Sequence, residues 1–286
     1  MNILFLTMYS DFTNIESRGI YTDLMRKFRN EGHDVYIIHP NERKFGRPTD
    51  VKTEGRIHCL GVRTLNVTKT NVVEKGIGQL LLESQFKRAL KQYFGNVRFD
   101  IILYSTPPIT FNNVIQYAKQ KSGGKALTYL LLKDIFPQNA VDMGMLSQTG
   151  IKGVLYKMFR RKEKELYRLS DFIGCMSPAN VRYVIEHNPE VEPRKVELAP
   201  NSIELTYSES TMNADSSVIL AKYGLPTDRP IFIYGGNLGV PQCIPFLLKC
   251  LDANADREDC HFVIVGSGTY FHQLANWYSK RNPKAI

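Results

Sequence analysis

Two glycine-rich segments near the end of the chain follow apolar runs and could hold a phosphate group. They are "IFIYGGNLG" and "HFVIVGSG". Glycine lets a ligand approach backbone N–H groups closely, and such groups at the start of a helix attract anions. Either turn alone is a weak signal, but two at neighbouring strand ends predict a nucleotide-diphosphate site. The residues expected there are Gly235, Gly236, Asn237, Leu238, Gly239, Gly266 and Gly268.

The first loop of the chain, "YSDFTNIESRG", contains a single glycine, Gly19. A nicotinamide-binding domain is expected to carry G-x-G-x-x-G at this place, so the loop argues against a dehydrogenase. Gly19 would lie where the loop enters a helix, and a phosphate or sugar could approach it, with Arg18 adding charge. A purely structural role for Gly19, in the turn that leads from the loop into the helix, is an equally good interpretation.

A carboxylate, Asp134, follows the apolar run "KALTYLLLK". At the carboxyl end of a parallel strand it could accept a proton from a sugar hydroxyl or hydrogen-bond to one. The alternative is a helix N-cap for a short helix that begins near Pro137, and the sequence alone favours that alternative.

The segment Ile151 to Leu169 carries seven basic residues and apolar residues at helical spacing. A basic amphipathic helix suits an anionic membrane surface. A surface helix with a solvated basic face fits the pattern equally well.

The elements that position these residues alternate between strand and helix patterns. Strands are expected at 2–8, 34–39, 56–63, 99–105, 125–134, 171–177, 195–202, 230–234 and 261–264, with the glycine turns 235–239 and 265–268 following the last two. Helices of ordinary length separate most of them, which predicts an α/β fold with parallel sheets. The polar stretch 205–229 is the best linker candidate, so we expect domains at 1–204 and 230–286.

The composition narrows the class of protein. The 286 residues have a net charge of +9, which favours an anionic partner. No apolar run is long enough to cross a bilayer, and the five scattered cysteines suggest reduced thiols in the cytoplasm. The basic residues belong to no identifiable nucleic-acid recognition motif, so nucleic acid is not an expected partner.

The order of motifs resembles glycosyltransferase family 4, particularly bacterial enzymes that build capsular or O-antigen polysaccharide. It runs from "NILFLT" through "KDIFPQNAVDMGML" and "VELAPNSIEL" to "IYGGNLGVPQ" and "FVIVGSG". The resemblance implies the GT-B architecture of two Rossmann-like domains facing a cleft, retention at the anomeric carbon, and no bound metal. The donor would be a UDP- or GDP-sugar, and the acceptor a lipid-linked or growing polysaccharide.

The resemblance also assigns residues. Gly19 and the turns with Gly236, Asn237 and Gly268 would contact the donor, and Asp134 lies in the family's D-x-x-P loop. Pro200 and Asn201 match its P-N-x-I turn. Asn237 and Gln242 stand where many relatives have Arg and Lys, so amides would replace charges at the diphosphate. The acceptor side is expected at Arg18, Pro137, Gln138 and Asn139.

The family's acidic donor-binding segment should follow residue 286, so the second domain is expected to be truncated. With only two strands its independent stability and the activity of this chain are doubtful. We therefore expect a cytoplasmic glycosyltransferase. If the basic helix binds lipid, the protein would be peripheral on the cytoplasmic face of the inner membrane. The alternatives are a non-catalytic remnant that binds acceptor or membrane, and, less favoured, an NAD-linked sugar epimerase or reductase.

Overall fold

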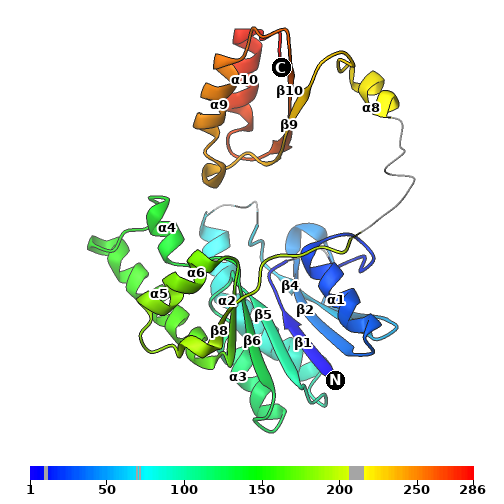
Figure 1. The fold of residues 1–286 in the computed structure, drawn as a ribbon. Coiled ribbons are helices and arrows are strands. Elements are labelled where there is room, and N and C mark those ends of the chain that lie inside the picture. The colour runs from blue at the N-terminus through cyan, green and yellow to red at the C-terminus, as the bar shows by residue number, and fades with distance from the viewer. Residues whose placement is uncertain (10–11, 69, 71, 206–215) are drawn as a thin grey trace. The chain divides into compact units, whose positions relative to one another are not determined.

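This computed structural model describes the whole chain except residues 10–11, 69, 71 and 206–215 (Figure 1). The chain divides into two compact units, Met1–Leu205 (unit 1) and Thr206–Ile286 (unit 2). Which unit receives the acceptor and which the donor stays a prediction.

Unit 1 is built on a single sheet with the strand order β3-β4-β2-β1-β5-β6-β7-β8 (Figure 1). The strands are β1 Asn2–Leu6, β2 Asp34–Glu42, β3 Asp50–Glu54, β4 Ile57–Thr64, β5 Ile101–Ser105, β6 Leu127–Leu132, β7 Phe172–Cys175 and β8 Val196–Leu198. Every pairing is parallel except that of β3 with β4. The α/β class with a parallel sheet, predicted from the sequence, is confirmed.

Helices cover both faces of this sheet. They are α1 Ile20–Asn30, α2 Val72–Tyr93, α3 Asn112–Lys121, α4 Gln138–Asp142, α5 Gly150–Leu169 and α6 Pro178–His187, with short 3-10 turns η1 Arg43–Phe45 and η2 Pro193–Lys195. On one face α1 packs Met25 and Tyr21 against Phe5, Ile37 and Leu103. The other face, with Leu4 and Tyr104, packs against helices that include α2, α3 and α5. Because both faces are covered, β1 reads as a continuous apolar run.

The edge strand β3 was missed by the sequence analysis. Its sequence, DVKTE, contains a single apolar residue, Val51, and is mostly exposed, so it carries no continuous apolar run. It pairs antiparallel with β4, from Asp50 opposite Gly61 to Glu54 opposite Ile57. Antiparallel edge strands with charged side chains are common on otherwise parallel sheets.

Unit 2 contains α8 Ser216–Tyr223, β9 Ile231–Asn237, η3 Val240–Gln242, α9 Ile244–Ala253, β10 His261–Ser267 and α10 Phe271–Arg281. The predicted linker 205–229 thus contains a helix, α8, and its part at 206–215 lies outside the described residues. β9 and β10 form a parallel pair. One face of the pair packs Phe262 and Ile264 against α9 and α10, whereas Ile233 and Val265, on the other face, are 69% and 59% exposed.

Candidate functional site

The face of the unit 1 sheet that α1 covers changes from apolar to polar at the carboxyl ends of the strands. Thr7 follows β1, and its N–H donates to the Ile38 carbonyl at 3.2 Å. Leu6 pairs with Ile38 and with Tyr104, so Thr7 lies between His39 and Ser105. The Ser105 hydroxyl donates to Thr7 Oγ1 at 3.2 Å. We call the row Asn41, His39, Thr7, Ser105 and Lys133 the polar edge; ligands of parallel α/β sheets bind at such ends.

The loop after β6 brings Lys133 and Asp134 to the end of this row. The backbone N–H groups of both residues donate to Thr106 Oγ1, at 3.0 and 3.3 Å. Thr106 is only 1% exposed, so it fixes the loop from inside the protein. Lys133 stands in the same loop as Asp134, but only Asp134 was predicted from the sequence as a site residue.

The Lys133 ammonium group lies between two polar neighbours. Nζ contacts Asn201 Oδ1 and lies 5.9 Å from the centroid of the Tyr21 ring. Among the residues that the structure describes, no carboxylate oxygen comes within 4.0 Å of this nitrogen. Burial lowers the pKa of Lys133, which shows that its positive charge is only partly solvated. A half-buried cation without a carboxylate is suited to an anionic ligand.

Asp134 lies near the same group of side chains. The residue is exposed, but partial desolvation by the surrounding protein raises the pKa of its carboxyl group. Burial also raises the pKa of Tyr21; a hydrogen bond with Ser105 lowers that pKa, and the charge of Asp134 raises it. Asp134, Tyr21, Ser105 and Lys133 therefore form one cluster at the carboxyl ends of β5 and β6. Perturbed pKa values in such a cluster are typical of functional sites.

The N-cap alternative for Asp134 is wrong. The N-cap of α4 is Pro137, and no side chain caps the helix there. The Asp134 carboxylate is thus not used by α4. Of the expected acceptor-side residues, Pro137 is buried, and Gln138 donates to Asp142 Oδ1 at 2.8 Å within α4. Asn139 has a buried side-chain oxygen with no hydrogen-bond partner.

Gly19 lies at the start of α1, as predicted, but its amide is engaged. The Gly19 N–H donates to Asp23 Oδ1 at 3.1 Å, and its carbonyl accepts from the Asp23 N–H at 2.8 Å. A Cβ at Gly19 would lie 3.2 Å from Thr22 Oγ1, so the position is crowded by the helix. Arg18 is exposed in the loop beside it. Gly19 itself therefore offers no unused N–H to a phosphate.

Three of the five unit 2 glycines expected at the nucleotide site lie inside strands: Gly235, Gly236 and Gly266. Gly239 and Gly268 lie just after the strands. Gly235 and Gly236 belong to β9, where they pair with Val265 and Gly266 of β10. A Cβ at Gly266 would lie 2.1 Å from the Gly236 carbonyl oxygen, and one at Gly268 would lie 2.4 Å from the Leu238 carbonyl oxygen. The expectation of a glycine turn at Gly235 is thus wrong, because Gly235 lies inside β9. Gly266 and Gly268 have a packing role: without side chains they let the ends of β9 and β10 approach each other.

Leu238 is a core residue of unit 2. It is 2% exposed, its N–H donates to the Ser267 carbonyl at 2.9 Å, and its own carbonyl accepts from the Tyr270 N–H at 2.9 Å. Both of its backbone groups are therefore used inside the unit. Gly239, the next residue, is buried and precedes η3.

The two amide side chains expected at the diphosphate are brought together by η3. Asn237 Nδ2 donates to Gln242 Oε1 at 3.1 Å, and both side chains are exposed. The Tyr234 hydroxyl donates to the Asn237 carbonyl at 2.9 Å, which holds the end of β9 in place. A polar pair at a strand's carboxyl end is what a bound phosphate or ribose would meet.

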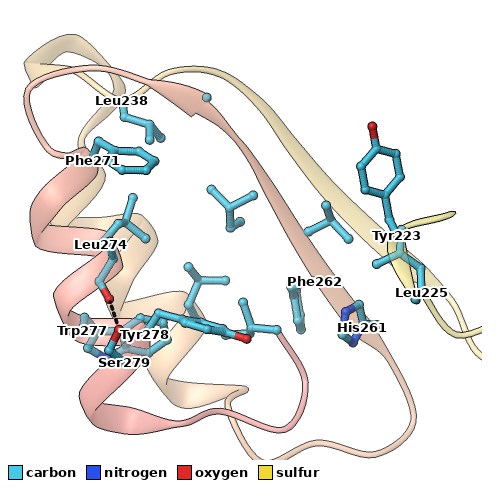
Figure 2. Close-up of a pocket in the computed structure, with 17 residues that line it drawn as sticks. Tyr223, Leu225, Leu238, His261, Phe262, Phe271, Leu274, Trp277, Tyr278 and Ser279 are labelled. Atoms are coloured by element: carbon cyan, nitrogen blue, oxygen red, sulfur yellow. Dashed lines mark hydrogen bonds between the residues drawn. The ribbon is translucent and has the colours of Figure 1, made fainter. Parts of the chain in front are cut away.

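A cavity of about 540 Å³ in unit 2 lies along β10 and α10 and not at this polar pair. Figure 2 shows its walls, which include Phe262, Leu274, Trp277 and Tyr278. These side chains are mainly apolar, so the cavity is a gap in the small core and lacks the polar groups that a diphosphate needs. Among the described residues, no group of three or more His, Cys, Asp or Glu could hold a metal ion.

Neither a protein-family model nor a curated protein sequence matches the chain. Solved structures do match it over nearly its whole length. The catalytic domain of starch synthase IV from Arabidopsis thaliana, bound to ADP and acarbose, matches 98% of this chain with a TM-score of 0.64 and 14% identity. HepE of Anabaena, in complex with UDP, matches 99% with a TM-score of 0.56 and 14% identity.

A third structure, an α,α-trehalose-phosphate synthase (UDP-forming) from Burkholderia vietnamiensis, matches 98% of this chain with a TM-score of 0.56 and 11% identity. The matched parts cover 71%, 66% and 68% of the three proteins' own chains, respectively. At such low identity the likeness concerns the fold. The fold of this chain is that of the GT-B glycosyltransferases, as the sequence predicted.

Proposed function

We propose that the chain is a nucleotide-sugar-dependent glycosyltransferase that acts with retention at the anomeric carbon. Its acceptor is a lipid-linked or growing polysaccharide of the cell surface. The observation that carries this proposal is the GT-B fold, matched over 98% or more of the chain to structures that include UDP- and ADP-bound ones. The cluster at the carboxyl ends of β5 and β6 supports it, because one loop offers both a carboxylate, Asp134, and a cation, Lys133, that pairs with no carboxylate of the described residues.

In this proposal the residues divide by unit. In unit 1, Asp134 orients the acceptor hydroxyl, and Lys133 with Tyr21 and Asn201 receives an anionic group of a substrate. In unit 2, Asn237 and Gln242 hydrogen-bond to the diphosphate of a UDP- or GDP-sugar. During transfer the bond from the sugar to the diphosphate breaks, the bond to the acceptor oxygen forms, and the Asp134 carboxylate accepts the proton of the acceptor hydroxyl.

The test is nucleotide binding and turnover by the purified chain. UDP and GDP are titrated by calorimetry, and release of the nucleoside diphosphate is followed from UDP-glucose, UDP-N-acetylglucosamine and GDP-mannose. We expect Asn237→Ala to weaken binding of the preferred nucleotide by at least about tenfold, since one hydrogen bond to a charged group is lost. The matched control is Gln273→Ala, an exposed amide on α10.

Two results would contradict the proposal. Binding of none of these nucleotides would favour a non-catalytic protein that binds acceptor or membrane. Saturable binding of NADH in their place would favour the NAD-linked epimerase or reductase.

We further propose that α5 contacts an anionic membrane surface, where a lipid-linked acceptor would be found. Four apolar residues, Ile151, Val154, Leu155 and Met158, are 90%, 68%, 46% and 43% exposed. Their spacing of three and four residues places them on one side of the helix. Lys152, Lys157 and Arg161 are exposed in the same stretch, whereas Leu166 and Tyr167 are buried. The contact is therefore expected from the first half of α5 alone.

No helix within the described part of the chain is long and apolar enough to span a bilayer. Flotation with vesicles tests the proposed contact of α5 with a membrane surface. We expect the chain to float with vesicles that contain phosphatidylglycerol, and Ile151→Ser with Val154→Ser to reduce the bound fraction by about tenfold, because two exposed apolar side chains are lost. The control is Leu80→Ser, which alters an apolar side chain of α2 that is 73% exposed. Equal flotation of the double variant and the control would rule out this contact.

A further inference from the structure

A cavity of about 230 Å³ lies in unit 1 at the outer end of the polar edge. The first loop, β2, β3, β4 and the segment between β2 and β3 line it. The residues used below are Phe12, His39, Asn41, Arg47, Asp50 and Lys52. The sequence analysis gave none of them a role, and the proposed function does not use them.

The hollow exists because Gly61 has no side chain. Gly61 lies on β4 between Asp50 of β3 and His39 of β2, with which it pairs. Paired residues point to the same face of a sheet, so the missing side chain leaves a gap between Asp50 and His39. Asn41 fills part of this gap: a Cβ on Gly61 would lie 2.2 Å from Asn41 Nδ2. The cavity is thus a specific feature of the sheet and not a gap between loops.

The inner wall of the cavity is polar. His39 and Asn41 are 4% and 5% exposed, and Asn41 Nδ2 donates to the Pro48 carbonyl at 3.1 Å. Phe12, 3% exposed, places an aromatic ring beside them, with its centroid 5.6 Å from that of His39 and the two rings tilted by 50°. Buried amide and imidazole groups next to an aromatic ring suit the hydroxyls and apolar faces of a sugar.

The rim of the cavity carries positive charge. Arg47 and Lys52 are exposed there, and within the described ranges no carboxylate oxygen lies within 4.0 Å of their side-chain nitrogens. Asp50, on the same strand as Lys52, is partly buried and forms no ion pair with either cation. The two cations are therefore available to an anionic group from outside, while Asp50 can accept a hydrogen bond from a hydroxyl.

We propose that this cavity binds one acidic monosaccharide unit, a pyranose that carries a carboxylate or a phosphate. Arg47 and Lys52 bind the acidic group, and Asn41 and Asp50 hydrogen-bond to ring hydroxyls. A volume of about 230 Å³ is below the roughly 300–1,000 Å³ of pockets for larger ligands, so a single ring fits. The inference rests on the proposed function only in identifying this sugar as part of the acceptor.

The test is an NMR titration of the full chain, without any nucleotide sugar, using methyl glucuronide, glucose 6-phosphate and methyl glucoside. We expect one of the two acidic probes to bind at least about tenfold more tightly than the neutral one, because only an acidic probe pairs with the cations. The tighter acidic probe tells whether a carboxylate or a phosphate is recognised. Arg47→Ala and Lys52→Ala should each weaken its binding by about fivefold.

The matched control is Lys125→Ala, an exposed lysine just before β6 and so at the amino edge of the sheet. It should leave the dissociation constant unchanged. Equal binding of acidic and neutral probes, or binding that Arg47→Ala and Lys52→Ala do not weaken, would overturn the inference, as would no binding at all. Both variants alter exposed side chains, so loss of folding does not confuse the result. The titration measures binding and no sugar transfer. Its result therefore stands even if the chain proves not to be a glycosyltransferase.

Discussion

Replacing Asp134 by Asn is expected to lower the turnover of sugar transfer by about 100-fold, at the low end of what a positioned acid–base group contributes. The dissociation constant of the donor nucleotide should not change, since the residues proposed to bind it lie in unit 2. The measurement is nucleoside diphosphate release from the preferred nucleotide-sugar, with the nucleotide's affinity determined separately by calorimetry.

The reason for this expectation is the position of the carboxylate. Its loop is held by hydrogen bonds from two backbone N–H groups to Thr106 Oγ1, so the Asp134 backbone does not depend on its side chain. No capping bond to α4 is lost either. Asn keeps the size of the side chain and removes the charge. A loss of turnover would therefore reflect chemistry and not local unfolding.

The control for this variant is Asp142→Asn, which removes a carboxylate from α4 where it accepts a hydrogen bond from Gln138. It should leave turnover unchanged. Equal turnover of the Asp134 variant and the unaltered chain would remove Asp134 from the mechanism.

The pH dependence gives a second readout of Asp134. Partial desolvation raises the pKa of this carboxyl group, and only its ionised form accepts a proton. The rate should therefore rise as the pH passes upward through this raised pKa and then level off. The Asn variant should lack that rise, because its amide does not titrate.

Most of the fold could be predicted because the central strands carry their own signal. β1 and β5 are buried on both faces, so their apolar runs are visible in the sequence. The register of the edge strand could not be predicted in the same way. β3 is exposed and polar, and it is defined by its pairing with β4 and not by its composition.

The candidate site was predicted where a residue type alone suggests chemistry, as with Asp134. Lys133 was missed because a lysine after a strand is ordinary until its surroundings are known; what distinguishes it is the contact with Asn201, 68 residues away. The cavity over Gly61 needed three paired strands to become visible. Glycines in the sequence were interpreted as ligand contacts, yet Gly266 and Gly268 are explained by close packing against β9 and Leu238.

The Gly19 amide, expected to face a phosphate, serves instead a buried ion pair that fixes the start of α1. The Asp23 carboxylate accepts hydrogen bonds from the Gly19 N–H at 3.1 Å, the Glu204 N–H at 2.8 Å and Arg26 at 2.6 Å. The side chains of Asp23 and Arg26 are 7% and 8% exposed. This cluster also attaches the last residues of unit 1 to its first helix.

Asp23→Asn is expected to destabilise unit 1 by about 2 kcal/mol at pH 7. Removing one partner of a buried ion pair often costs about 3–5 kcal/mol. We expect the smaller loss of about 2 kcal/mol here because Arg26 keeps its ion pair with Glu204, whose side chain is 58% exposed. The measurement is urea unfolding followed by far-ultraviolet circular dichroism. The single tryptophan, Trp277, lies in unit 2, so the transition seen by its fluorescence should not move.

The loss of stability should also depend on pH in a defined direction. Burial opposes ionisation of Asp23, but hydrogen bonds from the N–H groups of Glu204 and Gly19 and the Arg26 guanidinium together lower its pKa. A lowered pKa stabilises the folded chain fully above the unfolded value of about 4, and that stabilisation is lost as the pH falls through the folded pKa. The difference between Asp23→Asn and the unaltered chain should thus shrink below about pH 4. Glu31→Gln, which alters an exposed pair with Lys27 on the same helix, should give no measurable change at pH 7. A difference for Asp23→Asn that stays constant down to pH 3 would show that its charge is not what holds α1 and Glu204 together.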